Sequence, residues 1–236
     1  MKQLAILAIV LALIGCFGRV ADINYYQLDY VPTPKAMTNN ANYPYSIRVK
    51  DFDVAEAYRR NNIVYRQSPY KLHFYSHEQW AVRPEYLVSD MIFRHLETAN
   101  IFSEVRRSID ADEPDFTISG TIRALEEYDN QDEWYAHLAL HITLQDNRAK
   151  KVIWSREWNY RKKVSNLETV YVVRGLSELL ECINNEAVAD IDSIMSEKFS
   201  VKEKLPHANT TTSSEATSKD QNFIELEALP PPSKIE

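Results

Sequence analysis

The sequence predicts one α+β domain in which two main helices pack on a mostly antiparallel sheet. Residues 115–124, 134–144 and 152–160 alternate apolar and polar side chains, the period of a half-buried strand, and short polar connections join them. Long strands joined in this way form an antiparallel meander. Two further segments, at 84–100 and after Ser165, repeat apolar residues at helical spacing. This order of strands, helix, strands and helix predicts helices layered on one sheet.

Four shorter strands are expected before the first helix. They cover residues 25–30, 46–54, 63–66 and 71–75, the last two around a turn at Ser68 and Pro69. Pro84 then suits the first position of a helix, because that position needs no backbone N–H donor. We therefore expect the helix to run over residues 84–100.

The apolar residues of the meander predict which face of each strand is buried. In the first two long strands they are Phe116, Ile118, Gly120, Ile122, Ala124, Trp134, Ala136, Leu138, Leu140, Ile142 and Leu144. Ser165 and Glu168 fit a capping box at the start of the last helix. No proline interrupts that helix before Pro206, and the composition becomes rich in Ser and Thr from about residue 201. We expect the domain to cover 25–200 and 201–236 to be a disordered tail.

The amino terminus has the pattern of a lipoprotein signal peptide. Lys2 precedes an unbroken apolar run from Leu4 to Ile14, which as a helix would be only about 17 Å long. A bilayer core is about 30 Å thick, so the run suits a signal-peptide core better than a membrane span. Leu13-Ile14-Gly15-Cys16 resembles the lipobox of bacterial lipoproteins. That resemblance implies cleavage after residue 15, diacylglycerol on Cys16 and acylation of the new amino terminus.

Two consequences and one alternative follow from the lipobox. Residues 16–24 would form a short lipidated tether, which holds the domain close to the membrane. Phe17 stands where an Asp favours retention in the inner membrane of enteric bacteria, so by analogy we expect the outer membrane of a Gram-negative cell, on its periplasmic face. The alternative is an uncleaved signal anchor in which the cysteine is incidental.

Composition and motifs argue against several classes of function. The formal net charge is −7 without a basic stripe, which argues against nucleic-acid binding. With 4 glycines, a phosphate-cradling loop is nearly excluded, and no hydrolase, zinc-protease or nucleotide-binding motif occurs. We therefore expect no enzyme and no cofactor. Cys182 has no intrachain partner once Cys16 is lipidated, and we expect it to be a small buried residue on a helix.

No metal site is expected either. The histidine pairs 73/77 and 137/141 fall in probable strands, where four residues span about 13 Å, too far for one ion. Acidic residues gather at 126–133 but lack the spacing and the glycine of a calcium loop. We expect these carboxylates to be solvated at the tip of a hairpin.

Aromatic side chains concentrate at the junction between the fourth strand and the first helix. Trp80 stands among Phe74, Tyr75 and Tyr86. One interpretation is a corner of the hydrophobic core. The other is a surface that docks a partner or lipid, since Trp, Tyr and Arg dominate interface energetics. We take Trp80, Tyr75, Arg66 and Tyr86 as the candidate docking residues.

The same region resembles a known family. Tyr25-Tyr26-Gln27-Leu28 matches an early motif, Tyr65-Arg66 with Ser68, Tyr70 and Leu72 a second, Trp80-Ala81 with Pro84 a third, and Phe102 with Val105 a fourth. This pattern is similar to the ABC-type transport auxiliary lipoproteins of the paraquat-inducible protein C type. Asn100 departs from it, because the family often has glycine there.

The resemblance implies a function that composition does not. Such proteins are non-catalytic outer-membrane lipoproteins that work with a mammalian-cell-entry (MCE) domain protein, an ABC permease and an ATPase to move lipids or other hydrophobic molecules across the envelope. They are similar in fold to the amino-terminal domain of TolB, and they can assemble into homo-oligomeric rings that receive the MCE-protein tube. The alternatives are an assembly or pilot lipoprotein for another envelope machine, or an envelope enzyme whose site carries no motif.

Overall fold

A computed structural model describes residues 22–33, 42–107, 113–129, 133–166 and 168–203. Within them lie nine strands, a short 3-10 helix and two α-helices. Cys16, the signal peptide of 1–15 and most of the tether lie outside the described residues, as do residues 204–236 of the predicted tail. The last helix continues to Glu203, and so includes the first three residues of the predicted tail.

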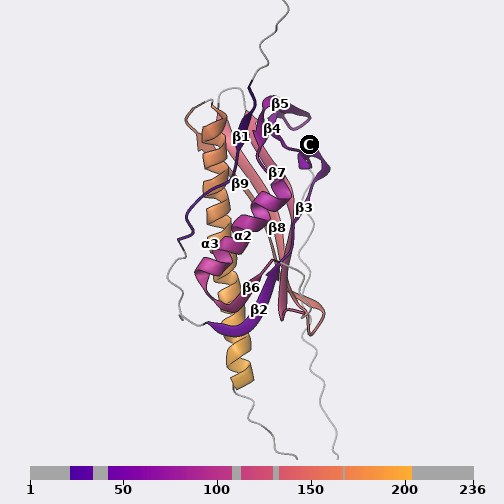
Figure 1. Ribbon diagram of the computed structural model, residues 1–236, viewed down its shortest axis with the longest axis vertical. Coiled ribbons are helices and arrows are strands. Elements are labelled where there is room, and N and C mark those ends of the chain that lie inside the picture. The colour runs from indigo at the N-terminus through magenta and orange to yellow at the C-terminus, as the bar shows by residue number, and fades with distance from the viewer. Residues whose placement is uncertain (1–21, 34–41, 108–112, 130–132, 167, 204–236) are drawn as a thin grey trace, which may run out of the picture.

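The long strand β7 (Phe116–Asp129) is the centre of the sheet (Figure 1). One edge pairs antiparallel with β8 (Trp134–Asp146), which pairs antiparallel with β9 (Lys151–Val164), so the predicted meander is confirmed. The other edge pairs, in parallel, with three short strands in succession: β2 (Tyr43–Val49), β3 (Asp53–Val54) and β4 (Asn62–Ser68). The sheet is therefore mixed, antiparallel among its long strands and parallel where the short ones join.

Three more strands extend the sheet. The predicted hairpin around Ser68 and Pro69 is formed by β4 with β5 (Lys71–Trp80), and β1 (Asn24–Tyr26) adds to β5 in parallel. The strand β6 (Phe102–Arg106), which periodicity did not predict, pairs in parallel with β2. A short 3-10 helix, η1 (Glu56–Tyr58), connects β3 to β4.

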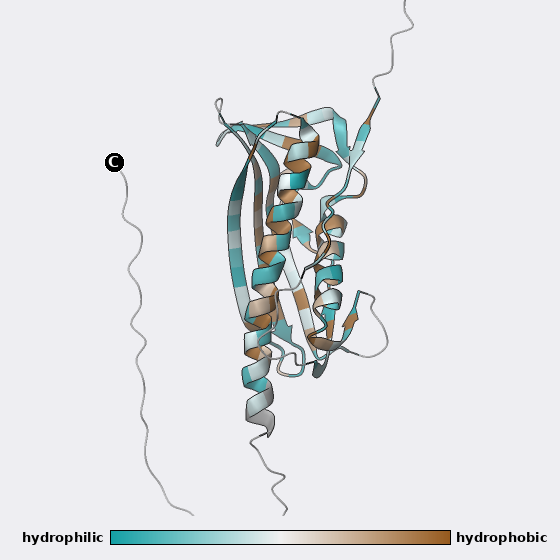
Figure 2. Ribbon diagram, turned by 90° about the vertical axis from the view of Figure 1, so that its left-hand side faces the viewer, coloured by the Kyte–Doolittle hydropathy of each residue, from teal (hydrophilic) through white to brown (hydrophobic). Residues whose placement is uncertain are grey.

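Both α-helices lie on one face of the sheet (Figures 1 and 2). Helix α2 (Pro84–Ala99) begins at proline, as predicted, and ends at Asn100 in the left-handed conformation (φ 53°). Asparagine tolerates this conformation better than most residues, which explains how it replaces glycine there. Helix α3 (Thr169–Glu203) begins after Glu168, whose backbone N–H donates to the Asn166 side chain. The backbone N–H of Glu168, which the predicted capping box would bond to Ser165, is bonded instead by the Asn166 side chain in an Asx turn.

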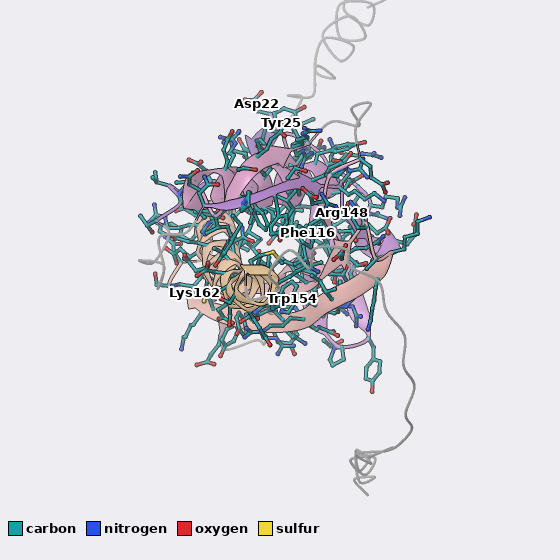
Figure 3. All side chains as sticks on the ribbon, turned by 90° about the horizontal axis from the view of Figure 1, so that it is seen from below. Asp22, Tyr25, Phe116, Arg148, Trp154 and Lys162 are labelled. Atoms are coloured by element: carbon teal, nitrogen blue, oxygen red, sulfur yellow. The ribbon has the colours of Figure 1, made fainter. Side chains whose placement is uncertain are left out.

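The core fills the space between the sheet and the helices. Apolar side chains of β8 and α3 are almost fully buried, including Leu138, Leu140, Leu176 and Leu180. A row of aromatic and charged side chains on β9 also meets α3: Trp154 and Arg156 both bond Asp190, at 3.3 and 2.9 Å. Figure 3, which looks along α3, shows Trp154 beside this helix. We call the face of the sheet that carries the helices the inner face, and its opposite the outer face.

A β-bulge interrupts β7 at Arg123. Ile122 pairs with Leu140 and Ala124 pairs with Ala139, so β7 advances two residues while β8 advances one. An extra residue reverses the alternation of side chains beyond it. Leu125 therefore faces the core, and Ala124 lies on the outer face. The prediction that Ala124 shares a face with Ile122 was wrong, because a strict period of two cannot show a bulge.

The packing around Gly120 gives a stability prediction. A Cβ added there would lie 2.4 Å from the backbone oxygen of His141 and 2.4 Å from Phe52. Gly120→Ala should therefore lower the free energy of unfolding by about 1–3 kcal/mol, the usual cost of overpacking. Denaturant unfolding measures it, with Thr121→Ala as the matched control on the other face of the strand. A Gly120→Ala protein as stable as the control would contradict this packing.

Candidate functional site

The structure does not bring the four candidate docking residues together. Trp80 is only 1% exposed and fills a corner of the core, so its side chain offers no surface to a partner. Arg66 points to the outer face, where it forms a buried ion pair, and Tyr75 points to the inner face. Tyr86, on the first turn of α2, is 39% exposed and lies next to Arg83. Of the four, Tyr86 is the one with a large exposed aromatic surface.

A buried polar group surrounds Glu126, on the outer face of β7. Its carboxylate is 1% exposed and accepts three hydrogen bonds, from Arg66 Nε at 2.8 Å, Tyr58 Oη at 2.5 Å and His137 Nδ1 at 2.9 Å. Burial alone would raise the pKa of Glu126, but these bonds hold it below its ordinary value. The other ring nitrogen of His137 lies 2.8 Å from Asn159 Oδ1. We call these five residues the Glu126 cluster.

The Glu126 cluster links four elements that are separate in sequence. Tyr58 comes from η1, Arg66 from β4, His137 from β8 and Asn159 from β9. Arg66 and His137 reach the outer face by the register of β4 and β8 with β7, and Asn159 by the register of β9 with β8. Arg66 also donates to the Tyr58 hydroxyl at 3.0 Å and to the carbonyl of Pro69 at 3.1 Å. The cluster therefore ties the β4–β5 hairpin to the meander.

An open groove of about 360 Å³ lies beside the cluster on the outer face. Its lining includes Tyr58, Arg66, Pro69, Arg123, Ala124, Glu126, Tyr128, His137, Ala139, Glu157, Asn159 and Arg161. Arg123 and Glu157 form an ion pair at 2.8 Å at its margin, and the Arg161 guanidinium stacks 4.2 Å from the centre of the Tyr128 ring. We call this space the outer groove. It is large enough for a small ligand, since ligand sites usually measure about 300–1,000 Å³.

The neighbouring carboxylate, Glu127, is buried on the inner face. It pairs with Ala136 of β8, against which Gly175 of α3 packs, and it is 2% exposed. The Tyr75 hydroxyl lies 3.1 and 3.2 Å from its two oxygens. Burial raises the pKa of Glu127 to about 7, and the hydrogen bond from Tyr75 offsets only part of that effect. The two glutamates are adjacent in sequence, but their surroundings lower the pKa of Glu126 and raise that of Glu127.

The buried glutamates correct the sequence-based expectation. We expected Glu126 and Glu127 to be solvated at a hairpin tip, but β7 continues to Asp129 and buries both. The sequence contains a signal for this burial. The alternation of apolar and polar side chains continues past Ala124 if the strand includes one extra residue. Cys182 was also predicted wrongly, because it is exposed and its thiol lies 3.5 Å from Glu186 one helical turn away.

Neither a metal cluster nor a membrane-spanning helix appears in the part of the chain that the structure describes. No three His, Cys, Asp or Glu side chains converge there as metal ligands would. None of the described helices combines the length and the apolar character needed to cross a bilayer. The paired histidines act separately, since His137 belongs to the Glu126 cluster and His141 lies 2.8 Å from the Ser155 hydroxyl.

Residues 26–188 match the family model of the ABC-type transport auxiliary lipoprotein component. The chain belongs to this family. The matched range includes every residue of the Glu126 cluster and runs from β1 into α3. It also contains three of the four sequence motifs in full, and the first from its second tyrosine onward. No curated protein sequence shows significant similarity to the chain.

Solved structures confirm the fold of this auxiliary lipoprotein. A DUF330-family protein from Xanthomonas campestris matches with a TM-score of 0.65 and 20% identity, over 75% of this chain and 99% of the other. A structure described as an uncharacterized protein matches with a TM-score of 0.59 and 14% identity, over 72% and 99%. Both are similar in architecture, and the predicted α+β fold class is confirmed.

Glu126 and Glu127 give opposite dependences of stability on pH. The raised pKa of Glu127 means that its contribution to stability is complete below about pH 4.5 and is lost as the pH rises through about 7. Glu127→Gln removes the charge that burial penalises. It should therefore stabilise the fold at pH 8 by about 2 kcal/mol and change it little at pH 4.

Glu126→Gln is the matched control on the next residue. The lowered pKa of Glu126 means that its contribution is present at neutral pH and lost as the pH falls below the ordinary range of a carboxyl. Its replacement leaves Arg66 without a counter-charge, so it should destabilise the fold at pH 8 by about 3 kcal/mol. Urea unfolding at pH 4 and pH 8 measures both variants. If both variants changed the free energy of unfolding in the same direction at pH 8, the environments assigned to Glu126 and Glu127 would be refuted.

Proposed function

We propose that this auxiliary lipoprotein is a non-catalytic component of an MCE-type ABC transport system, anchored in the outer membrane and facing the periplasm. In this proposal it works with an MCE-domain protein, an ABC permease and an ATPase to move lipids or other hydrophobic molecules. Copies of the chain would form a ring at the end of the MCE-protein tube. The observation that carries the proposal is the family match over residues 26–188, which includes nearly all the described elements.

The sequence of the amino terminus supports membrane anchoring. The lipobox places Cys16 eight residues before Asn24, where β1 begins. Eight residues extend to at most about 28 Å, so a lipid on Cys16 would keep the domain near the bilayer. Two or more acyl chains give a stable anchor, whereas one gives only marginal binding.

The polar side chains support a non-catalytic role. The buried carboxylate of Glu126 is saturated by three donors, and Glu127 is enclosed between the sheet and α3. A pair of carboxylates that acts as acid and base must lie within hydrogen-bond reach of the same substrate. Here the two neighbouring carboxylates are on opposite faces of one strand, and they cannot act on one substrate.

Replacement of Cys16 tests the anchor. Cys16→Ser removes the thiol that would receive diacylglycerol, so cells expressing it should incorporate no labelled palmitate into the protein. The variant should also remain an uncleaved precursor, detected as a slower band on a gel. Cys182→Ser is the matched control, because it removes the other cysteine and should leave labelling unchanged. Labelled fatty acid in Cys16→Ser would refute the lipobox.

Capture of partners from solubilised envelopes tests the transport role. The lipidated chain should bring down an MCE-domain protein, identified by mass spectrometry. Tyr86→Ala should weaken this capture several-fold if the exposed ring on α2 docks the partner. Val152→Ala, at an exposed apolar position on β9, should not. Recovery of a secretin or a hydrolase in place of an MCE protein would instead favour a pilot lipoprotein or an enzyme partner.

A further inference from the structure

We propose that the outer groove is a binding site for a phosphate group, held mainly by Arg161. The site is distinct from the transport role, because it needs neither the lipid anchor nor a partner protein. It follows from the shape of the outer face, from the charges around the groove and from the interactions of its three arginines.

The shape of the groove comes from the register of the strands. The bulge at Arg123 turns Ala124 to the outer face, opposite Ala139 of β8, and Ala139 pairs in turn with Asn159 of β9. Two alanines side by side leave the sheet without large side chains at that point. Longer side chains on either side, from Arg123 to Arg161, form the margins. The groove is therefore built by the backbone and does not depend on one mobile side chain.

The charges around the groove favour an anion. Three arginines against two glutamates leave an excess of one positive charge among the arginines and carboxylates of the lining. This excess occurs on a chain whose formal net charge is −7. Because the Glu126 carboxylate already accepts bonds from Arg66, Tyr58 and His137, it is screened from a ligand.

The three arginines differ in the ion pairs that their guanidinium groups already form. Arg66 is held by the buried Glu126. Arg123 pairs with Glu157, but both side chains are about half exposed, at 51% and 50%, and exposed pairs contribute little. Arg161 forms no ion pair with any carboxylate among the described residues; it stacks on the Tyr128 ring. Stacking fixes the plane of the guanidinium and leaves its N–H donors to a ligand.

These features fit a phosphate better than a carboxylate. Arg123 comes from β7 and Arg161 from β9, so their donors approach the groove from two different strands. A phosphate presents oxygens in several directions, whereas a carboxylate presents two in one plane. Arginine binds phosphate oxygens in a bidentate manner, with charge-assisted hydrogen bonds. The phosphate could be free or belong to a lipid headgroup, and the test separates the two sources.

The test is a titration of the purified full chain followed by NMR. One arm uses inorganic phosphate and the other dihexanoylphosphatidylglycerol, and the backbone amides of Ala139 and Asn159 report binding. Arg161→Gln should weaken the affinity for the probe that binds by tenfold or more, about 1.4 kcal/mol, because a charge-assisted hydrogen bond is lost. Lys162→Gln is the matched control, because it removes the same charge from the next residue, whose side chain pairs with Glu178 of α3.

Each outcome decides the proposal. Saturable shifts with both probes support a site for phosphate itself, and shifts with the lipid alone support a site for a phospholipid headgroup. Absence of saturable shifts with either probe overturns the site. Equal weakening by Arg161→Gln and Lys162→Gln also overturns it, because the binding would then follow net charge only. Failure to capture an MCE protein would leave this result unchanged, so the two proposals fail separately.

Discussion

Between Ile122 and Ala124, β7 advances two residues while β8 advances one, and this bulge assigns every later side chain of β7 to its face. Leu125 enters the core beneath the helices. Ala124 turns outward and makes the floor of the outer groove. Glu126 turns outward to the Glu126 cluster. Without the bulge, Ala124 would take the core position opposite Leu138 and Leu125 would turn to the outer face, so the core would lose a large buried apolar side chain.

The bulge also lies where the neighbouring strands change. Along its other edge, β7 pairs with β3 up to Ile122 and with β4 from Glu126 onward. The chain between those two strands forms η1, which brings the Tyr58 hydroxyl to Glu126. The Glu126 cluster thus compensates for the interruption: it joins η1, β4, β7 and β8 by hydrogen bonds where the ladder is broken. Buried polar groups stabilise specific arrangements only when all are satisfied, and the carboxylate of Glu126 is.

Periodicity predicted the meander, the hairpin and both helices, because half-buried strands and amphipathic helices carry local signals. What it missed depends on pairing between distant segments. The strand β6 is short and joins β2 in parallel, and the bulge is visible only against β8. Burial of Glu126 needs donors from three other elements, so a local pattern of acidic residues predicted a solvated tip. The sequence left two interpretations of Trp80, a corner of the core or a docking surface. Its burial favours the core.

Cross-strand NOEs between β7 and β8 test the bulge most directly. They report which backbone positions lie opposite one another in the chain without any substitution. With the bulge in place, contacts should join Ala124 with Ala139 and Leu125 with Leu138. A regular ladder continued from Ile122 would instead join Ala124 with Leu138 and Leu125 with His137. That second pattern would contradict the assignment of faces on which the Glu126 cluster and the outer groove depend.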